Sequence, residues 1–424
     1  MSLKNLLPSG ASYELRQQRT TTSAVSFSGN EFERISSSDS LSETLRLLHQ
    51  GKLSIANSSK PGDREELLKQ ALGTVAYGSP HDVDFAGEAT VAQLNLVDEA
   101  TLNTDQMVEM AGDFVADLRS VDPRLYVSAT IQATKEQVAL ETSKGFSHSY
   151  AKTAWTCFAG IELVQEEDRL GIFAFQMELG PHFNLKKLKE EQAQMLEYAK
   201  TVVDFAPGAY PVIFAPQEVF SIVNPIVASM NGMSVARKLS PWADKLGQEL
   251  LDPRFTLVDD GTLDKTMTSL PFDMEGTPTR RNVLVQSGRA DTLLLDRKTA
   301  QLLGKESTGN AGARGNPQPH HLQLATGNKS LEELIAAVDY GMIIYSTMGA
   351  WSGNPFAGIV SGTIALGLKI ENGKIVGRAK DCMFTVNAFE HLRKHFVDCS
   401  DITKPAMIHR FPYVLLDEVV ISTK

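Results

Sequence analysis

The sequence contains little cysteine and has no excess of positive charge. Three cysteines, Cys157, Cys382 and Cys399, occur among 424 residues. So sparse and odd a set is not a disulfide framework, and it fits a reducing compartment. With 41 basic and 51 acidic residues, the formal net charge is −10. Because non-specific nucleic-acid binding needs a basic surface, this balance argues against a nucleic-acid partner.

Long apolar runs of membrane type are also missing. The N-terminus has no apolar stretch of signal-peptide length. The longest uncharged stretch, residues 340–368, is interrupted by six glycines and by an Asn-Pro pair. A spanning helix prefers about 20 mostly apolar residues in succession. We therefore expect buried strands in this stretch, and a soluble, cytoplasmic protein without a membrane partner.

Several catalytic signatures are absent from the chain. It has no P-loop, no GxSxG nucleophile elbow, no CxxC pair and no HExxH motif. The segment around Gly309, Gly312 and Gly315 lacks the spacing of a dinucleotide fingerprint, and we interpret it as a loop. No repeat of 20–50 residues is visible, which argues against solenoids and propellers.

The pattern of apolar residues predicts two domains. At about 150 residues per domain, the length allows two or three. Helices are expected at 104–118, with Thr104 as the N-cap, and at 185–204, with strands clustered between them. The Ala-Pro-Gly sequence at 206–208 follows, so we place the boundary between residues 1–205 and 206–424. Long helices beside clustered strands predict an α+β fold with mainly antiparallel sheets, its second domain rich in strands.

One local pattern suggests a metal site. His391, His395 and Cys399 are spaced i, i+4 and i+8, so they lie near one face if the helix expected over 386–396 persists. Imidazole and thiolate together suit tetrahedral zinc. The simpler interpretation is that Leu392 and Phe396 face the core while the histidines face solvent, and we favour it.

A second histidine pair, His320 and His321, precedes an expected strand at 322–324. Neighbours in a strand point to opposite faces, so at most one of the two can enter a given pocket. Among the charged clusters, the dense and turn-rich run that contains Asp273, Glu275 and Arg280 is the most suggestive.

That run resembles a known family. Residues 269–281, Ser-Leu-Pro-Phe-Asp-Met-Glu-Gly-Thr-Pro-Thr-Arg-Arg, are similar to the signature of the TldD/PmbA family. The family was once called modulators of DNA gyrase and is grouped with metallopeptidases. The resemblance continues at 210–216, 244–247, 294–296, 299–300, 307–311 and 370–375, and it spans nearly the whole chain.

The family has two branches, which differ in their metal ligands. One carries an HExxxH motif on the helix after the strand at Phe214, and its glutamate would activate a metal-bound water. The other, the PmbA/TldE branch, lacks the ligands. Counting back from residues 236–238 places the matching position at 224–229, where Asn224, Pro225 and Ser229 stand in place of the motif residues. A slip in this alignment changes nothing, because no histidine occurs between His182 and His320.

Two further details favour the metal-free branch. Pro225 removes a backbone donor, so we expect a kink or break in the helix. Cys399 lacks the Gly-Cys-Gly-Lys setting of the metal-bearing branch. The resemblance therefore implies no catalytic residue, metal or cofactor in this chain, with zinc held by a partner subunit.

By resemblance, the chain is expected to be the PmbA/TldE-like subunit of a cytoplasmic peptidase complex that processes or degrades unstructured peptides. Its partner would be a TldD-like, metal-bearing homologue, and the working state a homo- or heterodimer. Asp273, Glu275, Thr277 and Arg280 are the candidate contacts for a peptide or partner, although the same residues can simply satisfy turns.

Two alternatives stay open. One is a stand-alone metallopeptidase with a site remodelled around His391, His395 and Cys399, or around His320 and His321. The other is a non-enzymatic, peptide-binding homodimer linked to gyrase modulation.

Overall fold

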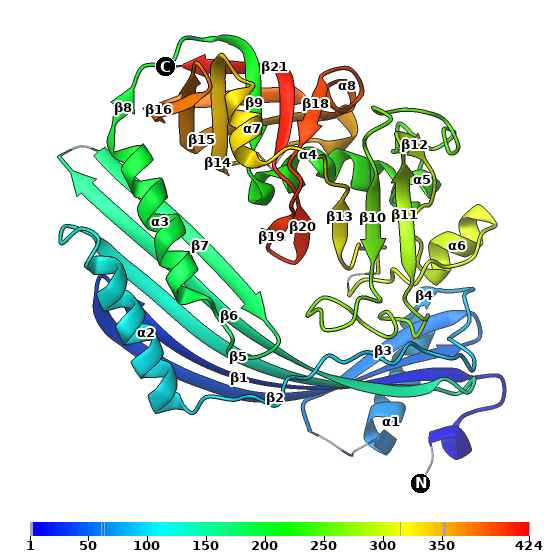
Figure 1. Cartoon of the computed structure of the whole chain (residues 1–424). Coiled ribbons are helices and arrows are strands. Elements are labelled where there is room, and N and C mark those ends of the chain that lie inside the picture. The colour runs from blue at the N-terminus through cyan, green and yellow to red at the C-terminus, as the bar shows by residue number, and fades with distance from the viewer. Residues whose placement is uncertain are drawn as a thin grey trace.

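A computed structural model describes residues 3–60, 62, 64–166, 168–313, 315–350 and 353–423. Within these ranges the chain forms three sheets, with one long, curved sheet at the N-terminal end and two sheets in the C-terminal half (Figure 1). Pairing is antiparallel except between β13 and β20, β14 and β9, and β16 and β8. The predicted α+β class, with mainly antiparallel sheets, is confirmed.

The first sheet has seven strands in the order β4-β3-β2-β1-β5-β6-β7. In β5, Val127, Ala129 and Ile131 are buried, and the polar residues between them are more exposed. This alternation is expected for a strand with one face against a core. The strand bounds are β1 (Ser12–Ser28), β2 (Glu31–His49), β3 (Lys52–Ser58), β4 (Ser79–Pro80), β5 (Tyr126–Thr142), β6 (Ser147–Gln165) and β7 (Asp168–Glu178).

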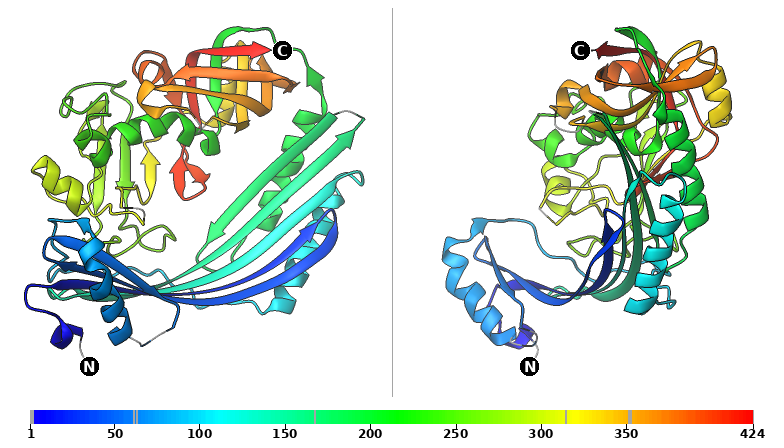
Figure 2. Two further views of the ribbon diagram at one scale, coloured as in Figure 1. Left: turned by 180° about the vertical axis from the view of Figure 1, so that it is seen from behind. Right: turned by 90° about the vertical axis from the view of Figure 1, so that its left-hand side faces the viewer.

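Helices α2 (Thr104–Arg119) and α3 (Leu185–Lys200) lie on the same side of this sheet (Figure 2). Helix α1 (Arg64–Thr74) packs against its β2–β3 end, followed by a 3₁₀ turn, η2 (Val75–Tyr77); another, η1 (Leu3–Leu6), lies near the N-terminus. The N-cap of α2 is Asn103, whose side chain accepts from Gln106 N, so the expected cap at Thr104 is wrong by one residue.

The C-terminal half contains the other two sheets. The six-stranded sheet has the order β12-β11-β10-β13-β20-β19. Its strands are β10 (Leu257–Asp260), β11 (Arg281–Gln286), β12 (Arg289–Ala290), β13 (Leu322–Leu324), β19 (Lys404–Ala406) and β20 (His409–Phe411).

The third sheet has the order β14-β9-β21-β17-β15-β16-β8; β14 also pairs with β15, and β18 with β21. Its strands are β8 (Val202–Val203), β9 (Gly208–Phe214), β14 (Tyr340–Met348), β15 (Ile359–Glu371), β16 (Lys374–Ala379), β17 (Cys382–Asn387), β18 (Phe396–Cys399) and β21 (Val414–Thr423). The uncharged stretch 340–368 thus supplies two strands, as expected, although residues 351 and 352 lie outside the described ranges.

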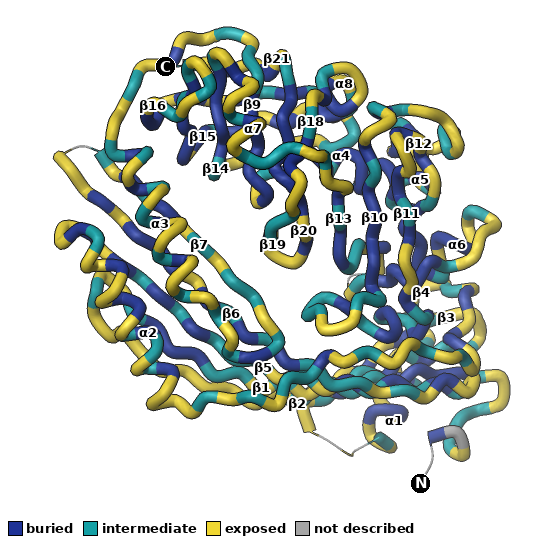
Figure 3. The backbone as a smooth tube through the Cα atoms, in the orientation of Figure 1, coloured by how far each residue is buried: buried dark blue, intermediate teal, exposed yellow. Residues whose placement is uncertain are grey.

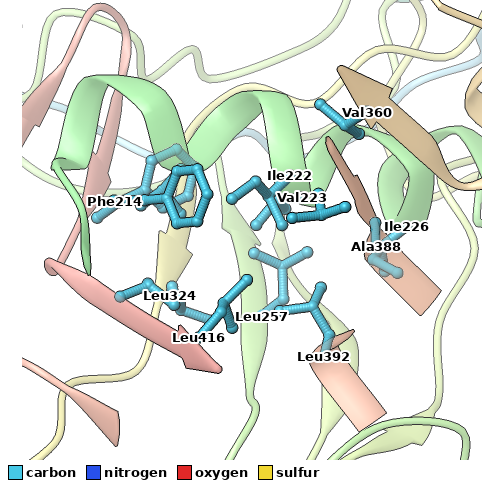
Figure 4. Close-up of a cluster of buried hydrophobic side chains, with 14 of the residues drawn as sticks. Phe214, Ile222, Val223, Ile226, Leu257, Leu324, Val360, Ala388, Leu392 and Leu416 are labelled. Carbon is cyan, nitrogen blue, oxygen red and sulfur yellow. The ribbon is translucent and has the colours of Figure 1, made fainter. Parts of the chain in front are cut away.

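Helix α4 (Pro216–Ser229) lies in the core of the C-terminal half. Its residues Ile222, Val223 and Ile226 pack with Phe214, Leu257 and Leu416 from the surrounding strands (Figure 4). The other C-terminal helices are α5 (Gly232–Ala236), α6 (Arg297–Leu303), α7 (Leu331–Ala336) and α8 (Ala388–Lys394), with a 3₁₀ turn, η3 (Pro355–Ala357).

Buried residues continue from one half of the molecule to the other (Figure 3). One cluster joins Ile131 and Leu196 from the N-terminal half to Ile343 and Leu368 from the C-terminal half. Helix α3 ends at Lys200, earlier than expected, because Val202 and Val203 pair with β16. The division into 1–205 and 206–424 stays a prediction. No helix in the described ranges is long and apolar enough to cross a bilayer.

Candidate functional site

Helix α4 is the element on which the family resemblance places the metal motif. It begins at Pro216, directly after β9, and continues through Pro225 to Ser229, so of the expected kink or break the break is absent. Pro225 is itself buried among core residues, and the Ser229 hydroxyl donates to the Pro225 carbonyl at 2.7 Å. Packing along the helix compensates for the missing backbone donor, which is a tertiary effect that the proline rule omits.

The side chains at this position do not fit a catalytic zinc. Ser229 is fully buried, Asn224 is half-buried, and α4 contains no histidine. Its only carboxylate, Glu218, accepts from Thr347 N at 3.2 Å and from Thr347 Oγ1 at 2.6 Å. Catalytic zinc needs three protein ligands from imidazole, thiolate or carboxylate. Over the described part of the chain, no group of three or more His, Cys, Asp or Glu residues is placed to hold a metal ion.

The candidate face of His391, His395 and Cys399 is not formed. Helix α8 ends at Lys394, and Cys399 lies on β18, where it pairs with Val414. His391 and His395 remain neighbours, with ring centroids 5.2 Å apart, but both His391 nitrogens lie within hydrogen-bonding distance of backbone carbonyls, of Asn387 and Glu418. Burial raises the pKa of the Cys399 thiol, which disfavours the thiolate that binds metal. The i, i+4, i+8 face does not form because the helix ends too early. Of the favoured interpretation, the core positions of Leu392 and Phe396 are confirmed, but the solvent-facing position of His391 is wrong, since that side chain is buried.

The signature run 269–281 forms a tight turn organised by Asp273. Its Oδ1 accepts the N–H groups of Glu275 and Thr277, and its Oδ2 accepts that of Ala311, each at 2.9 Å. Burial raises the pKa of this carboxyl to about 7, although the three N–H donors favour the charged form. A bridge between Phe272 and Pro278 closes the turn. Asp273 thus holds the loop together.

Glu275 connects the turn to the N-terminal sheet. Its Oε2 accepts the N–H of Arg297 at 3.0 Å, and its Oε1 lies 4.0 Å from Arg46 Nη2 on β2. Arg46 also pairs with the buried Glu14 at 3.0 Å. Arg297 in turn donates to backbone carbonyls of the segment at 84–85. Polar contacts therefore join the two halves at this point.

Thr277 and Arg280 differ in their exposure. The Thr277 side chain is buried, and its hydroxyl has no hydrogen-bond partner among the described residues. Arg280 is exposed and makes no side-chain hydrogen bond or ion pair within the described ranges. The structure brings Asp273, Glu275 and Thr277 together in one turn and leaves Arg280 at its accessible end. Their role as peptide or partner contacts stays a prediction.

A buried polar network next to this turn escaped the sequence analysis. Asp259, on β10, is fully buried, and its Oδ1 accepts the N–H groups of His320 and His321 at 2.7 and 2.8 Å. Its Oδ2 accepts from Asn310 Nδ2 at 2.7 Å. Asn310 also contacts Gln318 and Asn282, so the glycine-rich segment is fastened to β10 and β11.

The two histidines precede β13, which begins at Leu322, and their side chains make different contacts. His320 Nε2 lies 2.6 Å from the Gly309 carbonyl, while His321 Nδ1 lies 2.8 Å from that of Ile408. The signal that marked Asp259 was a pair of aspartates, Asp259 and Asp260, directly after two apolar residues in the strand at 257–260, because an aspartate in a buried strand requires partners.

A comparison with protein-family models matches residues 207–423 to the family described as "PmbA/TldA metallopeptidase C-terminal domain". A metalloprotease PmbA homolog from Haemophilus influenzae is 24% identical over 411 residues, covering 93% of this chain and 84% of the relative. An uncharacterized protein from Methanocaldococcus jannaschii is 28% identical over 244 residues, and the match spans 56% of this chain and only 57% of that protein.

Solved structures show the same fold. TldE from Thermococcus kodakarensis superposes with a TM-score of 0.89 at 22% identity, covering 97% of this chain and 96% of the other. A Thermotoga maritima protein named as a DNA gyrase modulator gives a TM-score of 0.90 at 21% identity, with the same coverage.

Proposed function

Because the chain belongs to the PmbA/TldD metallopeptidase family, we propose that it is a PmbA/TldE-like subunit of a cytoplasmic metalloprotease complex. In this proposal the chain joins a TldD-like homologue that carries the zinc ion, and the complex processes or degrades unstructured peptides. The chain itself supplies structure and binding surface, and no zinc ligand.

The observation that carries the proposal is the composition of helix α4. This helix follows β9 directly and is packed into the core on most of its surface. Zinc hydrolysis requires ligands and a general base at a fixed separation. With no imidazole on α4, and with its one carboxylate hydrogen-bonded to Thr347, the helix offers no zinc ligand or general base at the position where the family resemblance places the metal motif.

The charged turn at 269–281 fits a supporting role. It is held by buried hydrogen bonds and docks on the N-terminal sheet through Glu275 and Phe272. A subunit that closes a peptide cavity must keep its two halves in a fixed relation. Arg280, which is exposed at the end of this turn, is the residue of the predicted set that can reach a partner or peptide without unfolding.

The test combines metal analysis with reconstitution. The purified chain is expected to contain far less than one zinc per molecule and to leave an unstructured peptide intact. Mixed with the homologue of its own genome that has an intact HExxxH motif, it should co-elute in size-exclusion chromatography, and peptide cleavage should appear.

Controls separate the contributions of the two chains. The homologue alone measures its intrinsic cleavage, and a variant of the homologue in which the motif glutamate is replaced by glutamine should abolish cleavage without abolishing co-elution. A stoichiometric zinc ion together with peptidase activity in this chain alone would contradict the proposal, as would failure of the two proteins to associate.

A further inference from the structure

A cavity of about 280 Å³ opens on the six-stranded sheet, and Arg281, the last residue of the signature run, is part of its lining. Residues of β10, β11, β13 and β20 line it, and these strands are neighbours in the sheet (Figure 1). Two of the lining residues are arginines, Arg281 and Arg410, and no carboxylate is among them. The full lining is Thr256, Val258, Arg281, Gln323, Leu324, Ala325, Thr403 and Arg410.

Arg410 makes no ion pair with a described residue, and Arg281 makes a single long one. Arg410 Nε and Nη2 donate to the hydroxyl and carbonyl oxygens of Thr403 at 3.3 and 3.2 Å. The nearest carboxylate to Arg281 is Asp260, with Nε 4.0 Å from Oδ2, and that carboxylate already accepts from Thr262. A guanidinium has five N–H donors, so both arginines keep donors for a ligand.

Glu178, at the end of β7 in the N-terminal sheet, lies within electrostatic range of Arg410. Burial raises the pKa of Glu178, and the charges of His182 and Arg410 lower it by less. Glu178 and Arg410 form no ion pair among the described residues. The cavity itself therefore keeps two positive charges in a chain whose net charge is −10.

The shape and lining select a carboxylate. Two planar guanidinium groups match the two oxygens of a carboxylate, and each can bind it in a bidentate manner. The buried side chain of Val258 gives the cavity an apolar wall, and its cross-strand neighbour Gln323 is in register with Arg410. A single small cavity with two arginines does not follow a nucleic-acid backbone, which needs an extended basic surface.

We propose that this cavity binds the carboxylate of a peptide, either its free C-terminus or an aspartate or glutamate side chain. The inference rests on the proposed function only in taking a peptide as the ligand. The site would fix one end or one acidic position of an extended peptide, and so would set the register in which the complex presents it.

The experiment measures binding of three fluorescent peptides to the isolated full chain by anisotropy at low salt. The peptides share one uncharged sequence: the first has a free C-terminus, the second is amidated, and the third is amidated with one internal glutamate. Preference for the first assigns the site to the C-terminus, and preference for the third assigns it to an acidic side chain. Either ligand should bind at least about tenfold more tightly than the second peptide.

Variants connect the binding to the cavity. The double variant R281Q/R410Q should lose about tenfold or more in affinity for the preferred peptide, down to the level of the amidated peptide. R281K/R410K keeps the charge but not the planar fork, and an intermediate loss is expected. Arg393→Gln, an exposed arginine on α8, is the matched control and should leave affinity unchanged.

Several outcomes would overturn the proposal. The first is that all three peptides bind the wild-type chain equally or not at all. The second is that R281Q/R410Q binds the preferred peptide with unchanged affinity, with R281K/R410K as the folded reference. The third is that inorganic phosphate displaces the peptide at a lower concentration than acetate does. The experiment uses the isolated chain, so the peptide-binding result can be interpreted even if the chain does not associate with a zinc-bearing homologue.

Discussion

Phe272 lies edge-on to Phe146, with ring centroids 5.2 Å apart and an interplanar angle of 77°. Phe272 belongs to the signature run of the family, and Phe146 belongs to the hairpin between β5 and β6 of the N-terminal sheet. Both side chains are buried, together with Ala86 and Leu140. This contact makes the family signature a joint between the two halves of the molecule.

Replacing Phe272 with Ala should destabilise the chain by about 3–5 kcal/mol, because a large buried ring leaves a cavity that its neighbours fill only partly. Urea unfolding followed by circular dichroism measures the loss. Phe173→Ala is the control, since that ring is 58% exposed, and its unfolding midpoint should move much less. Equal losses in the two variants would show that the buried Phe272 ring contributes no more to stability than an exposed ring.

Gly276 tests how closely the joint is packed. Its φ is +76°, and an added Cβ would lie 3.0 Å from Leu140 Cδ2 and 3.1 Å from Ala86 Cβ. Gly304, the C-cap of α6, has a similar φ of +62° with open space around it. Both alanine variants carry the backbone strain of about 1 kcal/mol, so the additional loss in Gly276→Ala measures the crowding alone.

We expect Gly276→Ala to unfold at clearly lower urea concentration than Gly304→Ala, with a further cost of about 1–3 kcal/mol from overpacking. The comparison requires equal denaturant slopes in the two variants. If the two midpoints coincide, the side chains around Gly276 can move aside, and the joint is looser than the contacts indicate.

Arg46 carries the polar part of the joint. It pairs with Glu14, which is 3% exposed, at 3.0 Å, and lies 4.0 Å from Glu275. Arg46→Met should cost about 3–5 kcal/mol, because it leaves a buried carboxylate without a partner. Adding Glu14→Gln should recover part of the loss. Arg19→Met, which removes an exposed pair with Asp39, should leave the unfolding midpoint almost unchanged.

If Arg46→Met does not fold at all, the double variant Arg46→Met/Glu14→Gln tests whether removing the Glu14 charge restores folding. If the second change brings no recovery, the uncompensated Glu14 charge is not the cause of the loss. Other contacts of the Arg46 side chain would then dominate, among them its guanidinium carbon, which lies 5.5 Å from the centroid of the Phe85 ring.

His409 gives the structure a defined response to acid. It is buried and stacked on Phe220 of α4, and its Nδ1 accepts the N–H of Leu322 at 3.1 Å. Burial, followed by the charge of His321, lowers the pKa of His409 from 6.5 to about 4. Since the folded pKa lies below the unfolded value, this residue costs no stability above pH 6.5 and destabilises the fold progressively as pH falls toward 4.

The variant His409→Asn keeps a hydrogen-bond acceptor and does not titrate. We expect the wild-type chain to lose up to about 3 kcal/mol relative to this variant between pH 6.5 and 4. Urea unfolding at a series of pH values measures the difference. Parallel pH profiles for the two proteins would show that His409 becomes protonated without cost.

Local signals predicted most elements of the fold. The alternation of apolar and polar residues in β5 and the apolar stripe of α2 result from the periods of strands and helices, which neighbouring residues alone determine. The wrong predictions concern the residues at which helices end. Helix α8 stops at Lys394, and α3 stops at Lys200, because the following residues pair in strands with distant parts of the chain. No local pattern contains that information.

The missing imidazoles of α4 were visible in the sequence itself, since no histidine stands between His182 and His320. The sequence also showed the family run, the low cysteine content and the acidic balance. Only the tertiary structure decided that Pro225 is accommodated without a break, that Cys399 is separated from His391 and His395, and that Arg281 and Arg410 line one cavity. These outcomes depend on contacts between segments far apart in the chain, where packing and burial outweigh local preference.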